Sequence, residues 1–225
     1  MVKVAEKIKN TREKINALDF DAHWYRRAFH AFGASLIFYY MLPDVDWINV
    51  LKIWVPFFIV LFAIILEILR LKGKVSKDHF FGLRMYEEKR IGSYVFFAVG
   101  ILILFDFFPQ QIAIPCILCA CLGDPVIGEL RHRFGMRHVY AFGFLLCMFF
   151  FVVAWYKSDI KLMLLASVIG GVGAVVGETK KFQWLDDDFM IQIVPAVLLL
   201  IVWVSAQHFG LGLPGPIVHP LEMPW

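Results

Sequence analysis

Residues 47–69, WINVLKIWVPFFIVLFAIILEIL, decide the fold class, because they are almost wholly apolar and close to the ~20 residues with which a helix crosses a bilayer. Apolar stretches of this kind recur along the chain. The set extends over residues 28–43, 47–69, 91–108, 110–122, 138–156, 161–177 and 189–206. With 60% hydrophobic and 18% charged residues, the 225-residue chain is too apolar for a soluble domain of its size. The sequence predicts an all-α, polytopic transmembrane helical bundle of about seven spans.

The basic residues are concentrated in alternate gaps between the apolar stretches. Four gaps hold 19 of the 22 Lys and Arg residues: 1–27, 70–90, 123–137 and 178–188. Because Lys and Arg accumulate in cytoplasmic loops, we expect these gaps and the N-terminus in the cytoplasm and the C-terminus outside. Most acidic residues near the apolar stretches fall on the same side, where nucleotides and Mg²⁺ are found.

This pattern divides the chain into three parts. We expect a cytoplasmic N-terminal segment over 1–27, a transmembrane bundle with cytoplasmic catalytic loops over 28–206, and an external tail over 207–225. The net charge of +3 is modest, and its positive excess faces the cytoplasm. We interpret it as a topology signal and a contact with anionic lipid headgroups rather than with nucleic acid. The predicted location is the cell membrane or an internal membrane.

The four cysteines, Cys116, Cys119, Cys121 and Cys147, all lie in apolar stretches. The first three form a C-x-x-C-x-C run, a spacing that invites a metal interpretation, but no His or carboxylate is interleaved with them. We therefore interpret all four as small packing residues.

The fourth apolar stretch is short for a span and contains Pro115, so we expect an interrupted segment there, of the kind that often lines a site. Gly123 and Asp124 follow directly. Gly permits close approach of the backbone to a phosphate, and Asp offers a hard oxygen ligand for Mg²⁺. Arg131 and Arg133, further on, can neutralise phosphate oxygens. The alternative is an ordinary membrane-exit turn, and the spacing alone favours neither.

The gap after the sixth stretch carries a denser acidic pattern. Gly173 and Gly177 form a GxxxG step, which permits tight contact between helices, and Glu178 follows. Three consecutive Asp residues, 186–188, then lead into the last apolar stretch. One or two carboxylates are enough to cap a helix, whereas three at a membrane boundary favour a divalent cation. If Asp124, Glu178 and part of the triplet converge, they form an acidic site for a Mg²⁺-bound nucleotide.

Two further clusters lie on the same predicted face. Arg26, Arg27 and His30 stand at the start of the first apolar stretch. Arginines at such a boundary commonly anchor the chain, whereas an ionisable His at that depth is a functional candidate. A second run, residues 84–93, mixes charged residues with Gly and Ser before the third stretch.

In chain order, these clusters resemble the family of CTP-dependent polyprenol kinases, which includes dolichol kinase, phytol kinase and the CTP-using diacylglycerol kinase. The matching pieces are Arg26-Arg27-Ala28-Phe29-His30; Leu83-Arg84 with Glu87 and Gly92-Ser93-Tyr94; Leu122-Gly123-Asp124 with Gly128 and Arg133-Phe134-Gly135; and Glu178 followed by Leu185-Asp186-Asp187-Asp188. The resemblance implies transfer of the γ-phosphate of CTP, with Mg²⁺, to an isoprenoid or glycerolipid alcohol at the cytoplasmic face.

Roles for individual residues follow from their chemistry and from this resemblance. The expected Mg²⁺ ligands are Asp124, Glu178 and Asp187, and the expected catalytic residues are Asp124, Asp187 and His30. The expected nucleotide-binding or phosphate-binding residues are Gly123, Arg26, Arg131, Arg133, Lys180 and Lys181. Gly170, Gly171 and Gly173 are expected to leave room for the lipid tail.

The chain departs from the family in two places. The Lys-Thr/Ser and Glu-Gly segment that usually follows the Gly-Asp motif is absent, and the usual Asp-Asp-Asn is Asp186-Asp187-Asp188. Two alternatives stay open. A CTP:phosphatidate-type cytidylyltransferase uses the same reagents and has a similar Gly-Asp element, although its Lys-Arg and Gly-His-Gly-Gly-like signature is absent here. The second alternative is a non-catalytic membrane protein.

Overall fold

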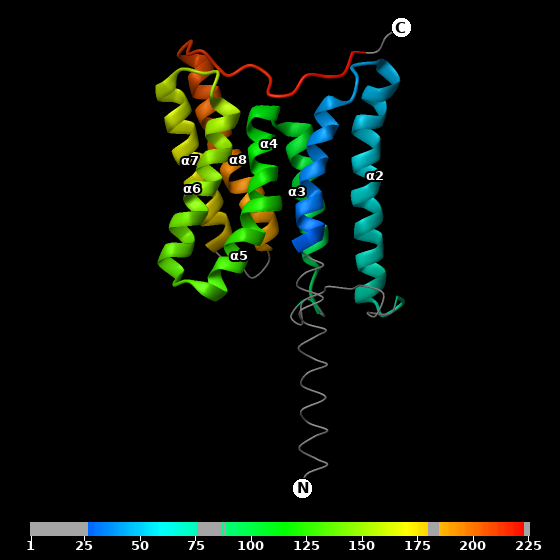
Figure 1. Ribbon diagram of the computed structural model, residues 1–225. Helices are drawn as coiled ribbons and strands as arrows, with labels where there is room; N and C mark the ends of the chain where they lie inside the picture. The colour runs from blue at the N-terminus through cyan, green and yellow to red at the C-terminus, as the bar shows by residue number, and fades with distance from the viewer. Residues whose placement is uncertain (1–26, 76–86, 88, 180–184, 223–225) are drawn as a thin grey trace.

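The computed structural model describes residues 27–75, 87, 89–179 and 185–222, and all secondary structure in this part of the chain is helical (Figure 1). Residues 27–33 are helical and lead into the 3₁₀ helix η1 (Ala34–Met41). The elements that follow are α2 (Asp46–Leu71), α3 (Ser93–Phe107), α4 (Gln110–Leu118), the π-helical segment η4 (Cys119–Gly123), α5 (Asp124–Arg133), α6 (Met136–Trp155), α7 (Ile160–Thr179) and α8 (Asp187–His208). The prediction of an all-α chain is confirmed for these residues.

Five helical runs are long and apolar enough to cross a membrane. They are Asp46–Leu71, Gln110–Arg131, Met136–Trp155, Ile160–Thr179 and Asp187–His208, and α3 is a shorter apolar helix. Their bounds lie close to those of the predicted apolar stretches, so a helical bundle suited to a lipid bilayer is confirmed at this level. α2 has this character most clearly, because only 11% of its apolar stretch is buried inside the protein.

Helices that follow one another run in opposite directions through the bundle, with α4, η4 and α5 counted as one continuous helix (Figure 1). At one end, α2, α5 and α7 finish and α3, α6 and α8 begin. We call this the acidic end, because the carboxylates described below gather there. The segment after α8 lies at the opposite end (Figure 1).

The glycines of α7 determine how closely it packs against α8. A Cβ atom at Gly177 would stand 2.5 Å from the carbonyl oxygen of Met190 in α8, and one at Gly173 would stand 2.9 Å from the Cα atom of Pro195. The GxxxG step therefore lets the two backbones touch, as small residues do between membrane helices. This contact brings the last turn of α7, which carries Glu178, beside the first turn of α8.

The expectation that Gly170, Gly171 and Gly173 leave room for a lipid tail is wrong. A Cβ atom at Gly170 would stand 2.6 Å from the ring of Phe151, and one at Gly171 would stand 3.1 Å from the ring of Phe144. Side chains of α6 thus fill the space that these two glycines leave. Gly173 is covered by α8 in the same way. The space over these glycines therefore holds packed side chains rather than a tail groove.

The fourth apolar stretch is helical through Pro115 and continuous with the helix that follows it, so the expectation of an interrupted segment there is wrong. Pro115 has no N–H to donate to the carbonyl of Gln111, four residues earlier. The indole N–H of Trp155 in α6 donates to that carbonyl instead, at 3.0 Å. The π-helical segment η4 follows, and the helix continues beyond the proline. A membrane helix tolerates proline where neighbouring helices satisfy the backbone groups that have lost their partners. Asp124 consequently lies in a helix rather than in a catalytic loop.

All four cysteines are buried and free of disulfides, within the apolar core formed mainly by α4, α6, α7 and α8. Cys119 and Cys147 contact each other across α6 and η4. A Cβ atom at Gly33 would stand 2.9 Å from the sulfur of Cys121, so the helical residues 27–33 pack closely on η4. These positions are those expected of small packing residues.

The segment after α8 crosses the opposite end of the bundle (Figure 1). The side chain of Gln110 both donates to the carbonyl of Val218, at 3.1 Å, and accepts from its N–H, at 2.9 Å. The N–H of Leu221 donates to the carbonyl of Met41 at 2.9 Å. Residues 209–222, which belong to the predicted tail, are therefore bonded to the bundle at the end away from the carboxylates.

Candidate functional site

Polar side chains from four parts of the chain meet at the acidic end. His30 comes from the first helical residues, Asp124 begins α5, Glu178 lies in the last turn of α7, and Asp187 and Asp188 lie in the first turn of α8. We call these five residues the acidic cluster. Ligand atoms of His30, Asp124 and Asp188 all lie within 4.8 Å of one another. The motifs that the sequence singles out therefore meet in space, whereas the roles predicted for them stay predictions.

The three consecutive Asp residues have different contacts. Asp186 is the N-cap of α8, and its Oδ1 accepts a hydrogen bond from the N–H of Asp188 at 3.1 Å. Asp188 is buried and turns toward His30 and Asp124. Asp187 lies near enough to Glu178 for the two carboxylates to act on each other electrostatically. Capping thus explains the first residue of the triplet, and the other two join the acidic cluster.

Glu178 is almost fully buried. Its side chain is 2% exposed, and its Oε1 accepts a hydrogen bond from Arg131 at 2.6 Å. Its Oε2 is buried as well, and the carboxyl groups of Glu178 and Asp124 are close enough to share a hydrogen bond. The carboxyl groups of Asp124 and Asp187 are its other charged neighbours. Arg131, predicted to bind phosphate, is therefore already paired with an acid of the cluster.

His30 is buried against the apolar core. Its ring meets the ring of Phe97 edge-on at 5.3 Å, and its Nε2 lies 3.8 Å from Oδ1 of Asp188. That distance is too long for a hydrogen bond but short enough for a strong attraction once the imidazole is protonated. His30 thus lies between the apolar interior and the carboxylates.

The acidic cluster gathers four carboxyl groups and one imidazole at one end of the bundle. Glu178 is paired with Arg131 and shares a hydrogen bond with Asp124, while Asp187 and Asp188 have further interactions of their own. Carboxylate oxygens are the ligands that Mg²⁺ prefers, so the residue types present fit a divalent cation.

The remaining predicted residues are placed as follows. Arg27 forms an ion pair with Glu129 of α5 at 2.6 Å. Gly123 is buried in η4, directly before Asp124. Arg26, Lys180 and Lys181 lie outside the described residues, and so does the side chain of Arg133.

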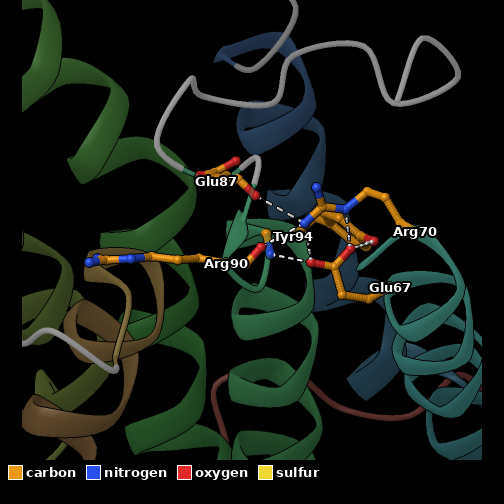
Figure 2. Close-up of polar contacts among 6 residues, drawn as sticks. Glu67, Arg70, Glu87, Arg90 and Tyr94 are labelled. Carbon is orange, nitrogen blue, oxygen red and sulfur yellow. Dashed lines mark hydrogen bonds and ion pairs between the residues drawn. The ribbon is translucent and has the colours of Figure 1, made fainter. Parts of the chain in front are cut away.

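A second polar cluster at the acidic end joins α2 to α3 (Figure 2). The carboxylate of Glu67 accepts two hydrogen bonds from Arg70, both at 2.7 Å, one from the N–H of Gly92 at 2.6 Å and one from the hydroxyl of Tyr94 at 2.7 Å. Glu67 and Arg70 are buried, with side chains 3% and 1% exposed. We call Glu67, Arg70, Gly92 and Tyr94 the α2–α3 clamp.

Glu67 and Arg70 are not among the site residues predicted from the sequence. A signal was present, because opposite charges three residues apart stand in the last turn of an otherwise apolar stretch, where unpaired charges are costly. Their partners Gly92 and Tyr94 were noticed only as parts of a motif. The clamp joins residues far apart in the sequence, so it became visible only in the folded chain.

Comparison with known proteins identifies no relative. The chain matches no protein-family model, and no curated protein and no solved structure is significantly similar to it. The likeness to polyprenol kinases is therefore one of short motifs, and the function has to be argued from the acidic cluster.

Proposed function

We propose that the protein is an integral-membrane lipid kinase that transfers the γ-phosphate of CTP to the hydroxyl of an isoprenoid or glycerolipid alcohol. The observation that carries the proposal is the meeting of His30, Asp124 and Asp188 within 4.8 Å. These residues belong to the first, third and fourth motifs of the polyprenol-kinase resemblance, and Glu178 lies beside them. Residues from three separate segments of the chain thus lie together, as a single binding site requires.

In the proposed topology, residues 27–41 and α3 complete a bundle of seven spans together with the five longer runs. The acidic end faces the cytoplasm in this topology, because the basic residues Arg70, Lys72 and Arg131 lie at that end. The segment 209–222 then lies on the external side. This orientation gives the acidic cluster access to cytoplasmic nucleotides and Mg²⁺, while the lipid alcohol reaches it from within the bilayer.

The chemistry required is mostly positioning and charge neutralisation. Mg²⁺, when bound, would neutralise charge on the carboxylates and on the nucleotide phosphates. Asp124 and Asp188 would hold it, with Glu178 and Asp187 beside them. His30, as the neutral imidazole, would accept the proton of the attacking hydroxyl, and Asp188 would stabilise the resulting imidazolium.

The test uses purified protein in lipid nanodiscs with Mg²⁺ and CTP that carries label at either the α- or the γ-phosphate. Acceptors are polyprenols, phytol, diacylglycerol and the corresponding monophosphates. We expect label from the γ-position in a lipid monophosphate, and none from the α-position. ATP in parallel reactions establishes the nucleotide preference.

Two results would overturn the proposal. Transfer of the α-label to a lipid phosphate with release of pyrophosphate would make the protein a cytidylyltransferase. Absence of transfer to every acceptor, with either nucleotide, from folded protein would favour a non-catalytic membrane protein.

A further inference from the structure

The α2–α3 clamp holds the backbone just before α3. Beyond its bonds to Glu67, Arg70 donates from Nη2 to the carbonyls of Glu87, at 3.1 Å, and Arg90, at 2.6 Å. Both oxygens of Glu67 have donors, and one donor is the N–H at the start of α3. A buried ion pair with such complete bonding fixes the chain around it more firmly than a surface loop. The position of Arg90 is therefore set by the end of α2.

The clamped segment lies beside the acidic cluster. Phe96, in the first turn of α3, contacts Phe189, which directly follows Asp188, with ring centroids 6.4 Å apart. Phe97 contacts His30 at 5.3 Å. The start of α3 thus packs against one member of the acidic cluster, His30, and against Phe189, the immediate neighbour of another. Residue 90 comes shortly before this part of α3.

Arg90 has a guanidinium available at this place. Its side chain is exposed and points away from the clamp toward the side on which α8 lies (Figure 2). It makes no hydrogen bond or ion pair with any residue that the structure describes. Arg27 and Arg131, by contrast, are already paired with Glu129 and Glu178. A polyphosphate at the acidic cluster needs cations besides the metal, and Arg90 can supply one without breaking an existing pair.

We propose that Arg90 binds the polyphosphate of the nucleotide at the acidic cluster, and that Glu67 and Arg70 are positioning residues that hold Arg90 there. The inference rests on the proposed function, because it assumes that a Mg²⁺-bound nucleotide occupies the cluster. The inference gives a role to the polar segment before α3, which contains none of the expected catalytic residues. The clamp fixes the backbone of this segment, and the side chain of Arg90 contacts the polyphosphate.

The test measures binding of CTP and of inorganic tripolyphosphate, each with Mg²⁺, to the full chain in nanodiscs by titration calorimetry. Arg90→Gln is expected to weaken both Kd values about tenfold or more, because it removes a charge-assisted contact to phosphate. Arg90→Lys keeps the charge and is expected to recover part of the loss. Lys72→Gln, which removes a charge at the end of α2, is the matched control and is expected to leave both Kd values within about twofold.

The positioning part is tested by Tyr94→Phe, which removes one hydrogen bond to Glu67 and leaves the buried ion pair in place. We expect a weaker Kd for both probes, with no added loss when Tyr94→Phe is combined with Arg90→Gln. If the loss of affinity in the double variant equals the sum of the losses in the two single variants, the positioning role is overturned.

The outcomes separate this inference from the proposed function. If the wild-type protein binds neither CTP nor tripolyphosphate, the proposed function and this inference both fail. If the wild-type protein binds them and Arg90→Gln binds them as tightly, the proposed function survives and the role of Arg90 is refuted.

Discussion

Two buried glutamates, Glu67 and Glu178, occupy comparable places and have opposite surroundings. Each lies in the last turn of a membrane-length helix at the acidic end, and each is almost fully buried. Glu67 receives four hydrogen bonds, from Arg70, Gly92 and Tyr94. Glu178 receives one from Arg131, and its other oxygen faces carboxylates.

Glu67 is thus bonded as a structural residue, whereas the surroundings of Glu178 favour the binding of a ligand. The bonds to Glu67 are complete, so this carboxylate stabilises the junction of α2 and α3 as it stands. Glu178 has an ion-pair partner in Arg131, but it also lies among the carboxyl groups of Asp124 and Asp187, whose negative charges repel its own. Such repulsion is typical of sites that are completed by something the chain does not supply.

The largest expected effect concerns the acidic cluster, to which Glu178 belongs. Asp124→Asn removes a carboxylate from the acidic cluster with little change of shape, and turnover in the labelled-CTP assay is expected to fall below about a tenth of wild type. Loss of a main Mg²⁺ ligand costs several kcal/mol of charge stabilisation, and each 1.36 kcal/mol is about tenfold in rate. Asp46→Asn, at the opposite end of α2, is the control. A variant that keeps more than about a tenth of turnover contradicts the metal role.

The second prediction sets the two glutamates against each other in stability. Glu67→Gln leaves Arg70 as a buried, poorly compensated charge and is expected to lower the free energy of unfolding by about 3–5 kcal/mol. Glu178→Gln leaves Arg131 partly exposed and relieves repulsion from neighbouring carboxylates, so its unfolding free energy is expected to stay equal or rise. Reversible unfolding in mixed micelles measures both. Equal destabilisation of Glu178→Gln and Glu67→Gln would contradict the difference in structural role between the two glutamates.

The smallest expected effect concerns the contact that places Glu178. Gly177→Ala puts a Cβ atom 2.5 Å from the carbonyl oxygen of Met190 and is expected to destabilise the bundle by about 1–3 kcal/mol. Gly128→Ala meets no atom within 4 Å in helix α5 and is expected to gain roughly 0.5–1 kcal/mol. The same unfolding measurement compares them, and equal effects would show that close packing of α7 on α8 is unimportant.

Sequence patterns were sufficient for the helices and for the close contact of α7 and α8. Apolar stretches near the length of a bilayer leave few alternatives to a helix, and the step from Gly173 to Gly177 permits one kind of packing. The acidic motifs were recognisable for a similar reason, since carboxylates are rare and costly near the membrane. These features depend on local composition, which the sequence displays directly.

Features that depend on distant partners could not be predicted. Pro115 does not interrupt its helix, because Trp155 from another helix donates to the carbonyl of Gln111. Which members of the Asp triplet turn inward depends on the N-cap geometry of Asp186. The α2–α3 clamp was missed because two of the donors to Glu67, Gly92 and Tyr94, come from a separate segment. In each case a tertiary contact decides between local alternatives of similar energy.

The bonds of Val218 and Leu221 to Gln110 and Met41 have a consequence for biogenesis. During synthesis, the carbonyl of Met41 and the side chain of Gln110 reach the membrane surface long before their partners exist. They remain solvated until α8 has inserted and the residues after it have been translated. The end of the bundle opposite the acidic end is therefore the last part to close, and a ribosome that stalls within α8 leaves it open.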